Sequence, residues 1–217
     1  MLVALTLTSW NDSSQKSDRP VPSTTPNGLT FWPFNVTTLG DTIDQMRSIF
    51  LVGYMGAGKS SVGAAVADRL GLTFVDLDEE ISRRLGAPIQ EIFARSGEAT
   101  FRAAEHDELA RSAESVDVVV ATGGGAFCSE SNREVIHGLG GVSVFLDLPW
   151  AALQQRLAHD HSDRPMYDDT NQARQLFEER LPHYRRALVQ VSIAGDEDPD
   201  EVAGRVVETL REAPCAI

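Results

Sequence analysis

At 217 residues and 42% hydrophobic content, the chain has the size and composition of one globular domain with a full hydrophobic core. Its net charge of −13 argues against nucleic-acid and membrane partners, and its longest apolar runs are too short to span a bilayer. Two cysteines, Cys128 and Cys215, are too few for a disulfide framework and fit a reducing cytoplasm. No long exposed apolar face is evident, so we expect a cytoplasmic monomer.

Residues 1–47 differ in composition from the rest of the chain. Asn11–Leu29 is rich in Ser, Thr, Pro and Asp and lacks hydrophobic periodicity, which predicts a disordered or loosely packed arm. Met1–Thr8 is apolar but has neither a basic segment nor an Ala-x-Ala cleavage site, so a secretory signal is not expected. Met46, which directly precedes the first predicted strand, is an alternative natural start.

From residue 48 onward, strand and helix patterns alternate along the chain. The runs predicted as strands are Ile49–Gly53, Thr73–Leu77, Asp117–Ala121, Val142–Asp147 and Val189–Ile193. The segments predicted as helices are Lys59–Leu70, Asp78–Leu85, Pro88–Arg95, Gly97–Glu114, Ser129–Leu139, Trp150–Ala158, Gln172–Leu188 and Pro199–Arg211. Such alternation predicts an α/β fold, in which a five-stranded parallel sheet is flanked by helices and binds ligands at the carboxyl ends of its strands.

The segment Gly53–Ser60 reads Gly-Tyr-Met-Gly-Ala-Gly-Lys-Ser and matches the Gly-x4-Gly-Lys-Ser phosphate-binding loop in full. It follows a predicted strand and opens a predicted helix, as this motif requires, which argues against a chance glycine turn. Backbone N–H groups and the helix dipole would hold phosphates, Lys59 would reach the β- and γ-phosphates, and the Ser60 hydroxyl would ligate Mg²⁺. The residues predicted to bind ATP here are Gly56, Ala57, Gly58, Lys59, Ser60 and Ser61.

Two aspartates end the second predicted strand. Asp76 and Asp78 lie two residues apart, so on an extended chain both side chains would point to one face. One carboxylate can hold the hydration shell of Mg²⁺, and the other can accept the proton of an attacking hydroxyl. The alternative interpretation is that Asp78 caps the helix that follows, and a residue can cap and also function.

An arginine and a glycine run come next along the chain. Arg102 and Glu105 are one helical turn apart, which by itself favours a surface ion pair. Arginine also suits planar carboxylates, and Glu105 could then orient its guanidinium group. Gly123–Gly125 follows a buried strand, where glycines contribute no packing and are useful if a ligand touches the backbone. The alternative for the glycines is an ordinary flexible turn.

The polar stretch from His159 to Asn171 separates two predicted helices and has no helical pattern of its own. It predicts a mobile lid that excludes water and brings Arg164 onto the phosphates as a catalytic cation. The alternative is a disordered surface loop. We reject a metal site at the His-x-His sequence of this stretch, because two histidines without carboxylate or cysteine partners are too few.

In their order along the chain, these motifs resemble those of the shikimate kinase family. The matching segments are Gly53–Ser60, Asp76-Leu77-Asp78, Phe101-Arg102-x-x-Glu105, Gly123-Gly124-Gly125, Arg164-Pro165 and Arg180-x-Pro182-x-Tyr184-Arg185. The resemblance implies a P-loop kinase fold with a lid over residues 48–217. It also implies phosphorylation of the 3-hydroxyl of shikimate by ATP, in aromatic amino acid biosynthesis.

The resemblance further implies roles for individual residues. Asp78 would hydrogen-bond the substrate hydroxyls and act as the catalytic base, and Asp76 would help bind Mg²⁺ through water. Arg102 and Arg180 would clamp the shikimate carboxylate, beside the backbone N–H groups of Gly124 and Gly125. The residues implied to bind shikimate are thus Asp78, Arg102, Gly124, Gly125 and Arg180.

The adenine side departs from the family pattern. Residues 194–198 are acidic where many members have a basic residue, so we expect that adenine contact to be lost or replaced by backbone. Asp147 is interpreted as a turn or cap residue, and Arg156 either approaches adenine or is a solvated helix arginine. Two alternative functions stay open from the sequence: a related small-molecule kinase such as gluconate kinase, and a non-catalytic nucleotide-binding regulator.

Overall fold

The computed structural model describes residues 23–24, 30–31, 48–159 and 170–212. The chain divides into two units, Met1–Thr37 and Thr38–Ile217. In the first unit, the described residues form a short antiparallel pairing of β1 (Ser23–Thr24) with β2 (Thr30–Phe31). The rest of the arm predicted over residues 1–47 lies outside the described residues.

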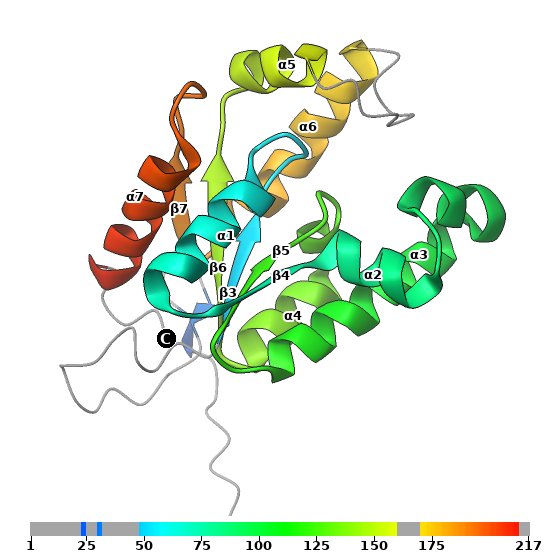
Figure 1. Cartoon of the computed structure of the whole chain (residues 1–217), viewed down its shortest axis with the longest axis horizontal. Coiled ribbons are helices and arrows are strands. Elements are labelled where there is room, and N and C mark those ends of the chain that lie inside the picture. Colours follow the sequence, from blue (N-terminus) through cyan, green and yellow to red (C-terminus); the bar gives the residue numbers. More distant parts are fainter. Residues whose placement is uncertain (1–22, 25–29, 32–47, 160–169, 213–217) are drawn as a thin grey trace, which may run out of the picture. The chain divides into compact units, whose positions relative to one another are not determined.

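The second unit is built on a five-stranded sheet with the strand order β4-β5-β3-β6-β7 (Figure 1). The strands are β3 (Ser48–Val52), β4 (Thr73–Asp76), β5 (Val118–Ala121), β6 (Gly141–Asp147) and β7 (Val189–Ser192). All neighbouring strands run parallel, and Ser48 of β3 is paired with Val118 of β5 and Gly141 of β6. The carboxyl end of β3 therefore lies at the centre of the edge where such sheets bind ligands.

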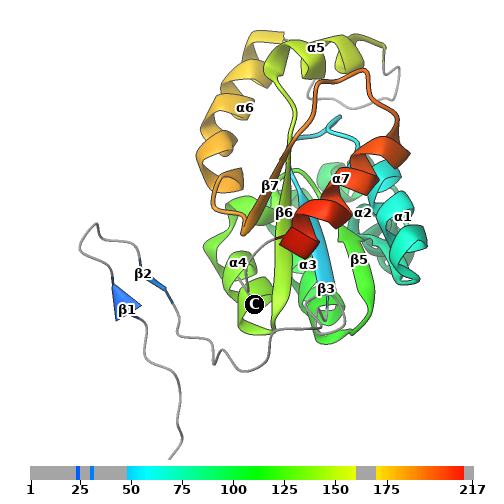
Figure 2. The ribbon, with the colours of Figure 1, turned by 90° about the vertical axis from the view of Figure 1, so that its left-hand side faces the viewer.

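Helices cover both faces of this sheet. They are α1 (Lys59–Leu70), α2 (Leu77–Leu85), α3 (Ile89–Glu114), α4 (Glu130–Gly138), α5 (Trp150–His159), α6 (Thr170–Tyr184) and α7 (Pro199–Glu212), with a short 3₁₀ turn, η1 (Ala126–Cys128), before α4. Helix α1 packs against α7 on one face, and α3 packs against α4 on the other (Figure 2). The predicted α/β architecture is thus confirmed. Among the described helices, none has both the length and the apolarity to cross a bilayer.

The three inner strands form the centre of the hydrophobic core. Every residue of β3 and β5 is buried, as is Gly141–Leu146 of β6. A parallel strand covered on both faces needs an almost continuous apolar sequence, which is why these strands were recognisable as apolar runs. The edge strand β7 instead alternates buried and exposed residues.

The structure differs from the predicted boundaries at two ends. Strand β4 stops at Asp76, so Leu77 and Asp78 belong to α2 rather than to the strand. The helix predicted to reach Leu188 ends at Tyr184, where the chain continues in tight turns. The two predicted helical segments on either side of Ser96 form the single element α3, which is kinked at Gly97 with φ 75° and ψ 168°.

Candidate active site

The loop Gly53–Ser60 connects β3 to α1, in the context that its sequence predicts. Gly53, Gly56 and Gly58 have φ values of 143°, 77° and 90°, which residues with a side chain rarely adopt. The N–H of Ala57 donates to the carbonyl of Tyr54 at 3.2 Å and closes the turn. The loop backbone therefore leads directly into the N-terminus of α1, where the helix dipole favours an anion.

Lys59 is the first residue of α1, and its side chain turns back over the loop. Its Nζ donates to the carbonyl oxygens of Gly53 at 3.0 Å and Tyr54 at 2.9 Å, and the residue is only 9% exposed. The next residue, Ser60, is exposed, and its hydroxyl donates to Oδ2 of Asp76 at 2.5 Å. This bond joins the start of α1 to the end of β4.

Asp76 is also the N-cap of α2. Its Oδ1 accepts hydrogen bonds from the backbone N–H groups of Asp78 at 3.0 Å and Glu79 at 3.3 Å. The interpretation of Asp78 as the cap is therefore wrong, as is the expectation that both aspartates extend from one face of a strand. The chain turns into the helix at Leu77 because the Asp76 carboxylate satisfies the first free N–H groups. Asp78 lies in the first turn of α2.

The glycine run after β5 is approached closely by three charged side chains. A Cβ built on Gly123 would lie 2.8 Å from Oδ1 of Asp78 and 2.9 Å from Oε1 of Glu105. A Cβ built on Gly125 would lie 2.6 Å from Nη1 of Arg102. Neither glycine has a positive φ. The absence of a side chain at these positions therefore leaves room for the ends of the three charged side chains.

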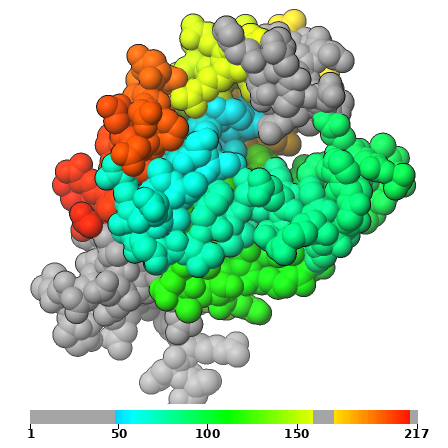
Figure 3. All heavy atoms as spheres, viewed as in Figure 1, coloured from blue at the N-terminus to red at the C-terminus, as the bar shows by residue number. Residues whose placement is uncertain are grey.

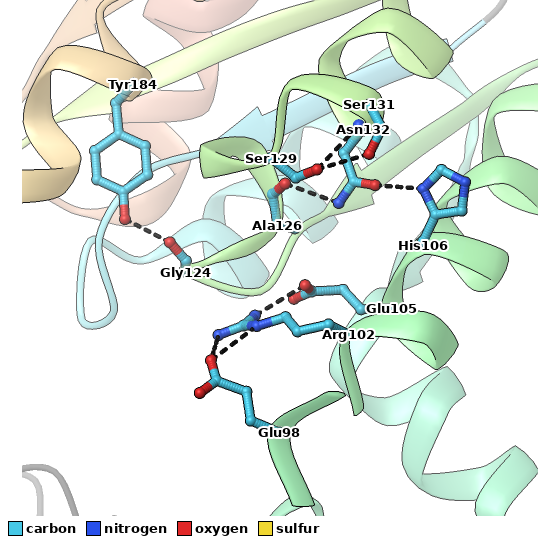
Figure 4. A network of polar contacts seen from close by, with 10 residues as sticks. All are labelled: Glu98, Arg102, Glu105, His106, Gly124, Ala126, Ser129, Ser131, Asn132 and Tyr184. Carbon is cyan, nitrogen blue, oxygen red and sulfur yellow. Dashed lines mark hydrogen bonds and ion pairs between the residues drawn. The ribbon is translucent and has the colours of Figure 1, made fainter. Parts of the chain in front are cut away.

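Arg102 on α3 has an acid on each side (Figure 4). Its Nη1 donates to Oε2 of Glu105 at 2.8 Å, while Nε and Nη2 both donate to Oε1 of Glu98, at 3.3 and 3.2 Å. The exposed fractions of the side chains are 34% for Arg102, 68% for Glu98 and 2% for Glu105. Burial lowers the pKa of Arg102, but the two carboxylates outweigh it and hold the pKa above its ordinary value.

Glu105 is buried next to the glycine run. Its Oε1 has no hydrogen-bond partner among the residues that the structure describes. Burial raises the pKa of Glu105, and its ion pair with Arg102 offsets only part of that effect. A buried carboxylate with an unsatisfied oxygen costs stability. Its place behind Arg102 agrees with the interpretation that Glu105 orients the guanidinium group.

A second arginine, Arg180, reaches the same glycines from α6. A Cβ built on Gly124 would lie 3.7 Å from its Nη1. One helical turn further, the buried Tyr184 donates its hydroxyl proton to the Gly124 carbonyl at 2.5 Å (Figure 4). The Tyr184 ring stacks on Phe145, with ring centroids 5.5 Å apart. Burial raises the pKa of Tyr184 well above its ordinary value, so its hydroxyl stays a donor.

Two residues of α4 hold the segment that follows the glycines. Asn132 Nδ2 donates to the Ala126 carbonyl at 2.8 Å, and Arg133 Nη1 donates to the carbonyls of Phe127 and Cys128 at 2.7 and 2.9 Å. Both side chains are buried. No role is predicted from the sequence for these two residues or for Tyr184. The one local signal is that Asn132 and Arg133 follow the N-cap Ser129 by one turn, directly behind the glycine run.

A cavity of about 620 Å³ lies beside these side chains, a volume typical of small-molecule sites. Residues that line it include Glu98, Arg102, Glu105, Gly125, Cys128 and Arg180. Figure 3 shows the surface hollowed next to α2 and α3. The structure thus gathers the residues predicted to bind shikimate around the glycine run, next to the phosphate-binding loop. Burial raises the pKa of the Cys128 thiol, despite the nearby arginines, so this cysteine is a neutral lining residue.

On the predicted adenine side, Arg156 is half-buried and donates to backbone carbonyls, so its interpretation as a solvated helix arginine is wrong. Its Nη1 donates to the Gly56 carbonyl at 3.3 Å, and its Nη2 donates to the Gly195 carbonyl at 2.8 Å. The acidic loop 194–198 is stabilised by Glu197, which accepts from the Ala194 N–H at 2.6 Å and pairs with Arg205 on α7. Arg164 and the rest of the predicted lid, residues 160–169, lie outside the described residues.

Comparisons with known proteins find similarity to one family. Residues 55–211 match the family model described as shikimate kinase. Over 76% of the chain, the shikimate kinases of Synechococcus sp. (strain CC9902) and Nostoc punctiforme (strain ATCC 29133 / PCC 73102) are 41% and 35% identical, with 86% and 92% of their own lengths covered. The solved shikimate kinase from Acinetobacter baumannii, in complex with shikimate, is 32% identical with a TM-score of 0.74, covering 81% of this chain and 98% of its own.

A gluconokinase from Sinorhizobium meliloti 1021 is also similar in structure. It is 24% identical with a TM-score of 0.51, and the match covers 77% of this chain and 93% of the gluconokinase. This likeness supports the fold alone.

Proposed function

The chain belongs to the shikimate kinase family and phosphorylates shikimate with ATP, and we propose that the site described above transfers the phosphate to the 3-hydroxyl. The observation that carries this assignment is the gathering of Asp78, Arg102 and Arg180 around Gly123–Gly125, directly beside a complete phosphate-binding loop. A base and two arginines at fixed positions suit a small hydroxy acid, which presents a hydroxyl and a carboxylate at the same time.

The donor phosphates bind to the loop and to the first turn of α1. The backbone N–H groups of Gly56–Ser61 neutralise phosphate charge, and the positive φ values of the glycines support this arrangement. Lys59 is held at the loop by two carbonyl oxygens, which keeps its ammonium group close to the transferring phosphate. Its charge stabilises the oxygens of that phosphate as the bond to the leaving group lengthens.

Mg²⁺ is the cofactor that fits the oxygen pair of Ser60 and Asp76. A hydroxyl and a carboxylate, joined here at 2.5 Å, are hard donors of the kind that Mg²⁺ prefers, and the ion usually keeps several waters besides. When bound, it would neutralise charge on the β- and γ-phosphate oxygens. Asp76 would hold it through water, while its Oδ1 continues to cap α2.

The acceptor is oriented from two sides. Arg102 and Arg180 bind the shikimate carboxylate, and the N–H groups of Gly124 and Gly125 lie beside it. Asp78 accepts the proton of the attacking hydroxyl; it lies in the first turn of α2, and its Oδ1 would lie 2.8 Å from a Cβ built on Gly123. Arg164, in the predicted lid, would add a cation over the phosphates when water is excluded.

The test combines a substrate panel with one variant. ADP release is measured with ATP, Mg²⁺ and shikimate, gluconate or nucleoside monophosphates, and only shikimate should support turnover. Arg180→Ala removes charge-assisted hydrogen bonds to the carboxylate, so the KM for shikimate should rise about 10- to 100-fold while the KM for ATP stays unchanged. Equal rises for both substrates, or turnover on gluconate alone, would contradict the assignment.

We also propose that the protein is a cytoplasmic monomer without nucleic-acid or membrane partners. The net charge of −13 supports the absence of nucleic-acid and membrane partners, because anionic polymers and lipid surfaces repel such a chain. Size-exclusion chromatography with light scattering, at working concentrations of enzyme, would reveal a dimer if the monomer assignment is wrong.

A further inference from the structure

The two acids beside Arg102 hold different parts of its guanidinium group and differ in burial. Glu105 is almost fully buried and binds Nη1 through a 2.8 Å hydrogen bond. Glu98 is 68% exposed and takes the opposite edge, formed by Nε and Nη2. We propose that Glu98 is a placeholder for the substrate carboxylate, which displaces it from this edge when shikimate binds. The inference rests on the proposed function, because it requires Arg102 to bind that carboxylate.

The geometry of the Glu98 contact is that of a replaceable partner. Nε and Nη2 share a single oxygen, Oε1, at 3.3 and 3.2 Å. A carboxylate that faces this edge squarely offers one oxygen to each nitrogen, at about 2.7–2.9 Å. The edge of Arg102 formed by Nε and Nη2 can therefore bind another carboxylate more strongly than it binds Glu98, while the contact with Glu105 remains.

The position of Glu98 in α3 explains how it reaches this edge. Gly97 interrupts the helix with φ 75° and ψ 168°, and nothing lies within 4 Å of a Cβ built on it. Backbone conformation, rather than packing, thus requires glycine there. Glu98 begins the second helical stretch, one turn before Arg102, and lines the same cavity. Its carboxylate consequently competes with any anion that approaches Arg102 from that cavity.

The energetic consequence is a lowered apparent affinity for shikimate. A ligand that must displace an internal partner binds only to the fraction of molecules in which that partner has left. An exposed pair four residues apart on a helix is weak, so the displacement is easy and the penalty is small. In return, the edge of Arg102 formed by Nε and Nη2 has a carboxylate partner whether or not substrate is bound.

Glu98→Gln tests the placeholder, because glutamine keeps the length and hydrogen-bonding capacity of the side chain but removes its charge. We expect the KM for shikimate to fall about two- to fivefold, with kcat and the KM for ATP unchanged. Glu91→Gln is the matched control: Glu91 pairs with Arg95 four residues on, in the same helix before the kink. It makes the same change in net charge and should leave the KM for shikimate unchanged.

A second measurement uses benzoate, a ring carboxylate without hydroxyls, as a competitor of shikimate. Its inhibition constant should fall in Glu98→Gln by the same factor as the KM. A shikimate KM that rises or stays constant in Glu98→Gln, while Arg102→Ala or Arg102→Lys raises it strongly, would overturn the placeholder alone. If neither Arg102 variant changes the KM for shikimate, the proposed role of Arg102 in substrate binding is wrong as well.

Discussion

Gly123→Ala places a methyl carbon between the two carboxylates that meet at the glycine run. The added Cβ would lie 2.8 Å from Asp78 Oδ1 and 2.9 Å from Glu105 Oε1, well inside the 3.4 Å at which ordinary contact begins. Each oxygen, at the end of its side chain, must therefore move by roughly half an ångström; a misplacement of about 1 Å can cost about 100-fold in rate, so this smaller shift should cost about 10-fold. Because Gly123 has no positive φ, alanine leaves its backbone unstrained. We expect kcat/KM for shikimate to fall by that factor, with the fold retained.

The assay is coupled ADP release, with the melting temperature measured in parallel. Gly138→Ala is the matched control, since a Cβ there meets nothing within 4 Å and the residue lies at the end of α4 without a positive φ. It should keep full activity and gain up to about 1 kcal/mol of stability. A Gly123→Ala enzyme with wild-type kcat/KM and melting temperature would refute the inference that Asp78 reacts in contact with the glycine run.

Lys59→Ala should chiefly lower kcat, because it removes charge from the transferring phosphate, and a kcat near that of the wild type would contradict this role. Tyr184→Phe keeps the stack on Phe145 but removes the donor to the Gly124 carbonyl. Thermal unfolding should show that the variant loses about 1 kcal/mol of stability, and steady-state kinetics should show that its KM for shikimate is higher than that of the wild type. Burial raises the pKa of Glu105, so the native state binds the carboxyl proton more tightly than the unfolded state does. The native state therefore loses stability as the pH rises above the ordinary carboxyl pKa. Glu105→Gln lacks that loss, so its unfolding free energy relative to the wild type should increase between about pH 4 and about pH 7. A constant difference would show that the pKa is not raised.

The fold was predictable because its inner strands are buried on both faces. Their apolar sequences, separated by helical patterns, are sufficient for a parallel α/β sheet. The end of β4 differs from the prediction because it depends on a contact between segments: Asp76 is oriented by the Ser60 hydroxyl and by the amides that it caps. The end of α6 differs for a similar reason, since Tyr184 is buried against Phe145 and Gly124 rather than on a continuing helix face.

The proximity of the predicted site residues also follows from the topology. The phosphate-binding loop, the aspartates and the glycine run each follow a parallel strand, and parallel strands end at one edge of the sheet. The residues that hold the glycine run from behind could not be found this way. Asn132 and Arg133 come from α4 and Tyr184 from α6, and only the tertiary packing brings them to the carbonyls of residues 124–128. Sequence spacing likewise could not show that Glu105 is buried and Glu98 exposed.

The arrangement of charge explains how a chain of net charge −13 can accept two anions. On the donor side, neutral backbone amides and one lysine suffice, and Lys59 is one of only two lysines in the sequence. On the acceptor side, Glu98 and Glu105 both pair with Arg102, so their negative charges offset the positive charge that the arginines bring to the site. If Glu98 leaves as the substrate carboxylate arrives, one anion replaces another on the same edge of the guanidinium group. Substrate binding would then leave the charge on that edge of Arg102 unchanged.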